Sequence, residues 1–199
     1  GPFNCCGVFF TKPTGRNHAI DHLDRPGLSE FKVPGGRIAT GCFQKTRDHC
    51  RFTQGEITDL DQIKKACPGH DAVIHLAAVP GPGRATLAQM LHVNLVATGL
   101  LLEAAVRAGI GKVVFASSGA VSGFSFQKRD ILPQYLPLDE QHPCEPHDEY
   151  GLSKLLAELT CKRYSDGFGL RTICLRINHN WYVDREGAQV AVRSGWAQH

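Results

Sequence analysis

Hydrophobic residues fall into short continuous runs that alternate along the chain with longer stretches of helical spacing. Weaker patterns predict a strand at 51–57 and helices at 59–67 and 146–163. Leu, Ala and Val recur at helical spacing over residues 85–108, and Gly109 follows where a helix C-terminal glycine would stand. Three runs have the unbroken apolar centre of strands buried on both faces: residues 71–78, 112–118 and 170–177. This alternation predicts an α/β fold with a parallel sheet covered by helices on both faces.

The first 50 residues look different from the rest of the chain. Gly, Pro and short polar runs interrupt them, and only residues 8–11 have the pattern of a strand. They carry 7 basic and 4 acidic side chains, whereas residues 51–199 carry 15 of each. We therefore expect a divergent N-terminal segment at 1–50 and a domain over 51–199.

Composition excludes several classes of function. The 199 residues are 42% hydrophobic and 21% charged, which is ordinary for a globular domain. A net charge of +3 is too small and too scattered for a nucleic-acid surface, and no zinc-finger spacing accompanies it. No apolar run approaches the roughly 18 residues of a membrane-spanning helix, and no secretory signal is seen. We expect a cytoplasmic protein that binds neither nucleic acid nor membrane.

The eight cysteines form no C-x-x-C pair. In a chain without a signal sequence they are interpreted as reduced thiols. A zinc site at Cys42, His49 and Cys50 is disfavoured by their spacing, so we predict no metal.

A parallel sheet brings the carboxyl ends of its strands to one edge, where such sheets bind ligands. Ser117 and Ser118 end one predicted strand, Ala77 and Ala78 end another, and Arg176 nearly ends a third. The long connection at 121–147 leaves the same edge, and connections of that length are usually functional.

The sharpest local motif is Tyr150-Gly-Leu-Ser-Lys154, at the front of the predicted third helix. Residues four apart lie on one helical face, so the Lys154 ammonium can sit near the Tyr150 phenol. A nearby positive charge lowers the pKa of a phenol and lets it exchange protons near neutral pH. The hydroxyl of Ser118 could orient a substrate oxygen toward Tyr150, which is general acid-base chemistry at an alcohol or carbonyl.

Five segments in order resemble the extended short-chain dehydrogenases/reductases, also called the NAD-dependent epimerase/dehydratase family. Departures from the family pattern are Glu56 for Asp, Ala97 for Gly and Ser122 for Tyr. The segments are QGEITD at 54–59 (family G-D-[IL]-x-D), DAVIHLAA at 71–78 (D-x-V-x-H-L-A-A), Asn94 with Thr98 (N-x-x-G-T), VFASSGAVSG at 114–123 (F-x-S-S-x-x-V-Y-G), and Leu138-Asp-Glu, Pro143 and Tyr150-Gly-Leu-Ser-Lys154 in series.

The resemblance implies a Rossmann-type doubly wound parallel sheet and hydride transfer with NAD or NADP, NAD slightly preferred. It implies a sugar or nucleotide-sugar substrate, epimerisation or simple oxidation and reduction, and a possible homodimer through the helices containing Asn94 and Tyr150. The implied catalytic residues are Ser118, Tyr150 and Lys154. The implied cofactor-binding residues are Glu56, Ile57, Leu76, Ala77, Ala78, Asn94, Ser117, Tyr150 and Lys154.

Each of these side chains also has a structural interpretation. His75 is expected to pack within its strand, and Ser117 to bond to backbone. Asn94 is expected to tie its helix to a strand and to affect the cofactor indirectly. Arg176 could be an ion-pair partner or a substrate ligand, and Glu56 could be a solvated acid or reach the adenine.

Both ends of the chain depart from the family pattern. The glycine turn that holds the pyrophosphate would fall near residues 11–18, where one glycine remains beside Pro13 and Arg16. After Arg176 the chain does not follow the family, and it ends at His199. We therefore expect an incomplete first βαβ unit and no C-terminal substrate domain. The alternative to an enzyme is a truncated or non-catalytic module of this fold that binds no cofactor.

Overall fold

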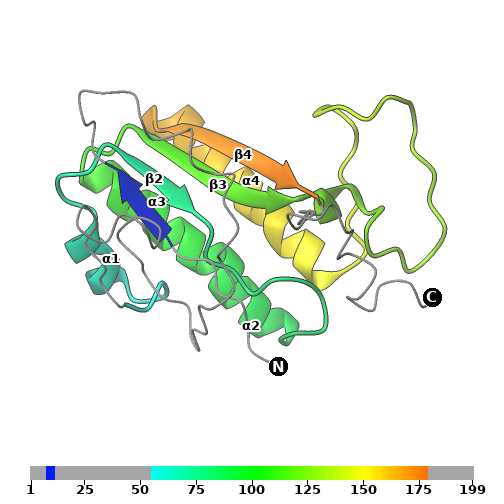
Figure 1. The fold of residues 1–199 in the computed structure, drawn as a ribbon, viewed down its shortest axis with the longest axis horizontal. Coiled ribbons are helices and arrows are strands. Elements are labelled where there is room, and N and C mark those ends of the chain that lie inside the picture. Colours follow the sequence, from blue (N-terminus) through cyan, green and yellow to red (C-terminus); the bar gives the residue numbers. More distant parts are fainter. Residues whose placement is uncertain (1–7, 12–54, 179–199) are drawn as a thin grey trace, which may run out of the picture.

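The computed structural model describes residues 8–11 and 55–178, and these form a four-stranded sheet with helices packed on it (Figure 1). The strands β2, β3 and β4 pair in parallel, as the alternating pattern predicted. β1, from the segment expected to be divergent, pairs antiparallel with β2. The strands lie in the order β1 (Val8–Thr11), β2 (Ala72–His75), β3 (Lys112–Ser118) and β4 (Arg171–Ile177).

The helices confirm most of the predicted elements. Residues 85–108 were predicted as one helix, and this stretch is helical from Leu87 to Arg107 with a π-helical turn inside it. The predicted strand at 51–57 is reduced to a single bridge at Glu56 within the described residues. The helical segments are α1 (Leu60–Ala66), α2 (Leu87–Leu91), η2 (His92–Val96), α3 (Ala97–Arg107), η3 (Gly119–Ser122) and α4 (Glu149–Phe168).

Side-chain chemistry sets the ends of these helices. The Asp59 carboxylate accepts hydrogen bonds from the first turn of α1, and Asp148 does the same for α4. Gly109 and Gly169 follow α3 and α4 at φ +74° and +68°, the left-handed conformation that ends a helix and favours glycine. Because Gly169 rather than Arg163 stops α4, this helix runs five residues further than predicted.

The core lies between the sheet and the helices behind it (Figure 1). Side chains alternate along β3, and Val113, Phe115 and Ser117 face the helices. They meet the apolar face of α3, including Leu101 and Leu102, which are fully buried. Of the part of the chain described, all long helices lie on this one face, so the helical cover predicted for the opposite face is not found there.

The α2, η2 and α3 segments form one 21-residue helix that is long and apolar enough to cross a membrane by composition. Its buried residues, among them Met90, Leu101 and Ala105, pack in the protein core. Core packing therefore accounts for the apolar residues on its buried face.

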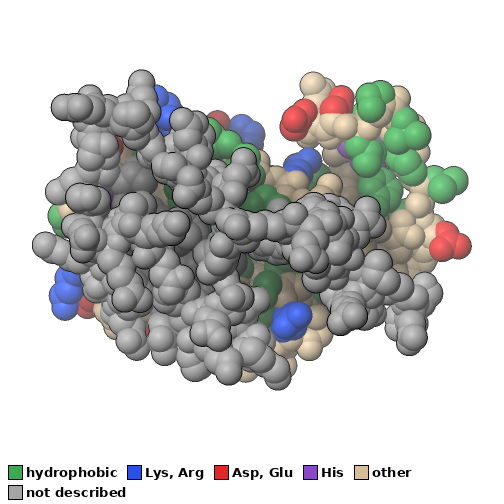
Figure 2. Space-filling model, viewed as in Figure 1, with side chains coloured by type: hydrophobic (Ala, Val, Ile, Leu, Met, Phe, Trp, Pro, Cys, Tyr) green, Lys and Arg blue, Asp and Glu red, His purple; other side chains and the backbone are tan. Residues whose placement is uncertain are grey.

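The long connection between η3 and α4 projects from the body as a lobe (Figure 1). Phe124 and Tyr135 pack against the His142 ring, with centroids 5.4 and 5.0 Å away. Hydrophobic side chains gather on the lobe (Figure 2). The exposed ones are Leu132, Tyr135, Leu136 and Leu138.

Candidate active site

The carboxyl ends of the three parallel strands meet at one edge of the sheet. Ser118, the last residue of β3, pairs in register with Ile177, the last residue of β4. β2 leaves the sheet after His75, so the family-like residues Leu76, Ala77 and Ala78 begin the loop at the same edge. The predicted strand at 71–78 is therefore shorter than expected.

Ser118 caps the short helix η3. Its Oγ accepts a hydrogen bond of 3.2 Å from the Ala120 N–H, which fixes the side chain at the strand end. This bond uses a lone pair, so the hydroxyl hydrogen can be donated to an oxygen outside the turn.

Tyr150 and Lys154 lie on successive turns of α4, as the motif predicted. The Lys154 side chain is buried, and its Nζ donates a 2.8 Å hydrogen bond to the Ala116 carbonyl on β3. The same ammonium lies 5.8 Å from the centre of the Tyr150 ring and 4.8 Å from that of Phe115. The positive charge is thus held between the catalytic candidate and the strand that ends at Ser118.

A close approach at Gly151 brings the Ser118 turn against α4. A Cβ at this glycine would lie 2.6 Å from the Ala120 carbonyl oxygen, too close for any side chain. Gly151 follows Tyr150 directly, and Ala120 lies two residues after Ser118. Glycine at 151 therefore allows the turn that follows Ser118 to pack against the first turn of α4, which carries Tyr150.

Asn94 joins the β2 edge to the catalytic helix. Its Oδ1 accepts from the Val79 N–H at 2.7 Å, and its Nδ2 donates to the Val79 carbonyl at 3.2 Å and to Ser153 Oγ at 2.9 Å. Ser153 in turn donates to the Tyr150 carbonyl at 2.7 Å. The side chain of Asn94 is 1% exposed and its polar atoms are engaged by the protein. The expectation that Asn94 ties its helix to the sheet edge is confirmed, and contact with a cofactor remains a prediction.

His75, the last residue of β2, is linked to Asn94 through Thr98. Thr98 Oγ1 donates its one hydrogen to the Asn94 carbonyl at 2.7 Å, so the 2.9 Å contact with His75 Nε2 requires that nitrogen to be the donor. The His75 Nδ1 is then unprotonated, and it has no partner in the described part of the chain. Complete burial, with the nearby Lys154 charge, lowers the pKa of His75 to about 3. The expected packing role of this histidine is confirmed.

Ser117 and Arg176 both bind Glu158 on α4. The Ser117 hydroxyl donates to Glu158 Oε1, so the expected backbone partner was wrong. The Arg176 guanidinium donates to the same carboxylate from Nε at 3.2 Å and Nη2 at 2.9 Å. Of the two interpretations left open for Arg176, the ion pair is the one observed. Glu158 was missed because a glutamate four residues after a lysine is typical of a solvated helix surface.

The GEITD segment (55–59) also has structural roles. The Glu56 carboxylate accepts hydrogen bonds from the N–H and hydroxyl of Thr58, and Ile57 is fully buried in the core. Asp59 caps α1, a role that the sequence pattern Asp followed by an apolar helix could have indicated. Adenine contacts of Glu56 and Ile57 remain predictions.

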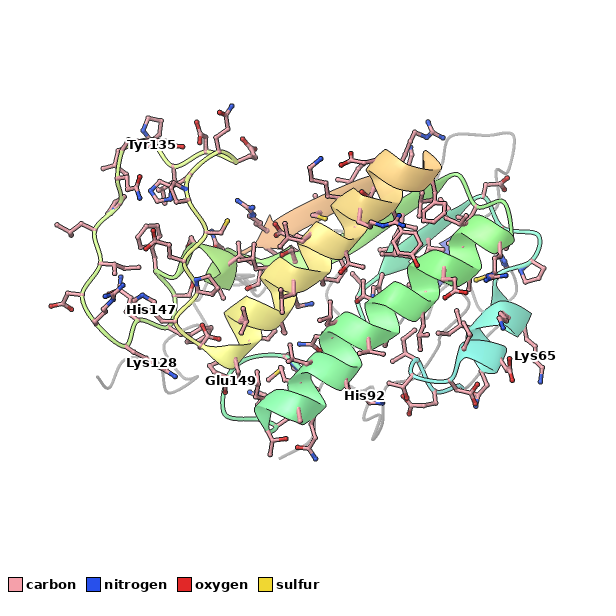
Figure 3. The ribbon with its side chains drawn as sticks, turned by 180° about the vertical axis from the view of Figure 1, so that it is seen from behind. Lys65, His92, Lys128, Tyr135, His147 and Glu149 are labelled. Carbon is pink, nitrogen blue, oxygen red and sulfur yellow. The ribbon has the colours of Figure 1, made fainter. Side chains whose placement is uncertain are left out.

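The loop after β2 is held to the start of α4. The Gly83 N–H donates a 2.8 Å hydrogen bond to Glu149 Oε1, and this bond lowers the pKa of Glu149. Figure 3 shows Glu149 at the end of α4 nearest that loop. Tyr150, the next residue, is therefore placed beside the loop that begins with Leu76 and Ala77.

A phenol, an ammonium and a hydroxyl at the carboxyl edge of a parallel sheet fit the ribose and the reacting oxygen of a nicotinamide dinucleotide complex. Ala77 is buried in the core and Ala78 is half-buried, so contact of either with a cofactor remains a prediction. The expected pyrophosphate turn near residues 11–18 lies outside the described residues except for Thr11, as do the zinc candidates Cys42, His49 and Cys50.

Comparison with known proteins agrees with this arrangement. The sequence model of the NAD dependent epimerase/dehydratase family matches residues 17–189. The chain belongs to this family. The expected Rossmann-type fold is also confirmed, because solved structures of the family superimpose on it: a dTDP-glucose 4,6-dehydratase from Streptomyces venezuelae with NAD bound is 30% identical, with a TM-score of 0.58 over 66% of this chain and 39% of that one.

Curated relatives in the family carry several activities. L-arabinose 1-dehydrogenase (NAD(P)(+)) of Haloferax volcanii is 35% identical to this chain, and the matched segment covers 61% of this chain and 50% of that protein. A UDP-glucose 4-epimerase of Azospirillum brasilense is 34% identical, with 73% of this chain and 39% of its own covered. The chain thus spans half or less of the length of these relatives. The boundary proposed at residue 50 remains a prediction.

Proposed function

We propose that this chain is the dinucleotide-binding and catalytic part of an NAD(P)-dependent epimerase or oxidoreductase that acts on a sugar or nucleotide sugar. The observation that carries the proposal is the placement of Tyr150 beside the buried Lys154 ammonium, with the Ser118 turn packed against the same helix through Gly151. The relatives named above, which act on sugars or nucleotide sugars by their names, support this class of substrate.

The chain's own residues have distinct roles in this reaction. Ser118 donates its hydroxyl hydrogen to the reacting substrate oxygen and orients it. Tyr150 accepts the proton from that oxygen when an alcohol is oxidised and returns it when a carbonyl is reduced. Lys154 stabilises the phenolate, which is the form of Tyr150 before it accepts this proton and after it returns it.

Lys154 and Tyr150 would also hold the nicotinamide ribose, with Leu76, Ala77 and Ala78 along the cofactor. When bound, the dinucleotide supplies the acceptor or donor of hydride. NAD is proposed ahead of NADP. Structures of similar proteins contain each of them: NAD in the dehydratase above, and NADPH in RMD from Pseudomonas aeruginosa, which is 28% identical with a TM-score of 0.58 over 65% of this chain and 43% of that one.

The first test is a thermal melt of the purified chain with each of the four nicotinamide dinucleotides. A ligand at 100 times its dissociation constant adds about 2.7 kcal/mol to the folded state, which a melt resolves. A shift with one dinucleotide supports the proposal and selects the cofactor for a screen of sugars. A cooperative melt without any shift favours the alternative, a module of this fold that binds no cofactor.

Tyr150→Phe tests the assigned base in a chain that turns over a sugar. The substitution removes the hydroxyl and leaves the ring, and we expect kcat to fall at least 100-fold because general acid-base catalysis contributes about 10²–10⁴-fold. Dinucleotide binding in the melt serves as the control for folding. Activity that survives the change would show that another residue moves the proton.

We also propose that two copies associate through the outer side of the two long helices. The α2–η2–α3 helix and α4 run side by side on one face of the sheet (Figure 3). Large apolar side chains on them are exposed: Leu87, Val96, Leu152 and Leu159. Light scattering during gel filtration should give twice the chain mass, and Leu159→Glu should give one. Leu132→Glu, on the projecting lobe, is the matched control.

A further inference from the structure

Glu158 forms a partly buried contact with the ends of two strands of the proposed active-site edge. It lies on α4 one turn after Lys154, and its side chain is 11% exposed. Its carboxylate accepts hydrogen bonds from Ser117 on β3 and from two nitrogens of Arg176 on β4. Burial of the pair is compensated, because a bidentate guanidinium and a hydroxyl together satisfy the carboxylate oxygens.

The two partners of Glu158 are themselves paired across the sheet. Ser117 stands opposite Arg176 in the β3–β4 register, one residue before the strand ends at Ser118 and Ile177. The Arg176 Nη1 also reaches the Glu140 carbonyl, at 3.5 Å, on the connection that leads into α4. One carboxylate therefore links two strand ends and this connection to the helix that carries Tyr150.

We propose that Glu158 is a positioning residue that, through Ser117 and Arg176, fixes the Ser118 strand end against the Tyr150 helix. Its effect on catalysis rests on the function proposed above. Glu158 touches no reacting atom in this scheme. The hydrogen bond to Ser117 adds to the Lys154–Ala116 bond in fixing β3 on α4, and the ion pair with Arg176 fixes β4 and the Glu140 segment.

Ser117→Ala is the most selective variant, because it leaves the Glu158–Arg176 pair intact and removes only the contact of Glu158 with β3. We expect kcat to fall about 10- to 100-fold with the substrate KM within about twofold, since a displacement near 1 Å at a reacting group can cost 10²-fold. Ser117→Thr keeps the hydroxyl and should restore kcat to within about threefold of the unmodified chain. Glu158→Gln should reduce kcat in the same way, and adding Ser117→Ala to it should cost little more, because the two residues act through one contact.

Glu103→Gln is the matched control. Glu103 forms an exposed ion pair with Arg107 at 2.8 Å on α3. This variant therefore removes a glutamate charge, as Glu158→Gln does, but at a site away from the strand ends. Its kcat should equal that of the unmodified chain.

Hydrogen exchange provides a readout that needs no turnover. In Ser117→Ala and Glu158→Gln, amides over residues 118–123 should exchange at least about tenfold faster than in the unmodified chain, while those of α3 should not change. A chain that turns over no sugar would contradict the proposed function, and the exchange data would then decide on the Glu158 contact alone. Unchanged exchange and a kcat within twofold in both variants would overturn the positioning role.

Discussion

The buried His75 should make the stability of this protein fall between pH 7 and pH 5. Its pKa in the folded protein is about 3, against an ordinary value of 6.5, because burial and the nearby Lys154 charge disfavour the imidazolium. In the unfolded chain the ring takes up a proton below pH 6.5. The unfolded state therefore binds more protons throughout the window from about 6.5 down to 3, and stability is lost as the pH falls through it.

The size of the effect follows from these two values. At pH 7 the folded ring is neutral and about a quarter of the unfolded rings are protonated, so the contribution there is only about 0.2 kcal/mol. A pH of 5 lies about 1.5 units below the pKa of the unfolded ring, which is then almost fully protonated, while the folded ring is still neutral. This difference lowers the free energy of unfolding by about 2 kcal/mol. That is a large fraction of the stability of an ordinary domain, which is about 5–15 kcal/mol.

His75→Gln isolates this contribution. The Gln amide nitrogen can replace Nε2 as the donor to Thr98, and it does not titrate. Urea unfolding of both proteins at pH 7 and pH 5, followed by circular dichroism, gives four free energies. The unmodified chain should lose about 2 kcal/mol more than His75→Gln on acidification, because all other titrating groups cancel in the difference. Equal losses in the two proteins would refute the assignment of a neutral, buried His75.

Two further predictions concern backbone approach and buried polar contacts. Gly151→Ala should destabilise the fold by about 1–3 kcal/mol, because the new methyl meets the Ala120 carbonyl, whereas Gly99→Ala in α3 has open space and should add up to about 1 kcal/mol in a chemical denaturation series. A stabilising Gly151→Ala would show that no close approach exists. Asn94→Ala should cost about 1–3 kcal/mol in the same assay and expose the Val79 amide to hydrogen exchange, because that buried N–H loses its acceptor; unchanged exchange there would contradict the bridge.

Local sequence patterns predicted the elements that depend on local chemistry. The bounds of β3 match the predicted 112–118, since an apolar run flanked by Gly111 and the Ser118 cap defines both ends. The motif at Tyr150 and Lys154 likewise predicted two side chains on one helical face, as found. Both features are decided within a few residues of the chain.

Features that depend on distant pairings were not predictable in this way. The direction of β1 against β2 is set by which strand it meets, not by its own four residues. β2 ends at His75, and the backbone that follows it is held at Val79 by Asn94, 15 positions further along the chain. No local sequence pattern indicated the role of Glu158, because its partners Ser117 and Arg176 lie on two strands distant in sequence from its helix.

The π-helical turn at His92–Val96 changes which residues of the long helix can be deleted without rotating its apolar face away from the core. There the Ala97 N–H bonds to the carbonyl of His92, five residues back, so the turn holds one more residue than an α-helical turn. The apolar faces before and after it stay aligned on the core only because the extra residue is absorbed at this place. A single-residue deletion within the turn should therefore leave the apolar residues of both halves of the helix facing the core, and should change only the direction of the Asn94 side chain. The same deletion within α3 would instead rotate Leu101 and the residues after it by about 100° away from the sheet. The length of this helix is thus under a different constraint at its centre than at any other point.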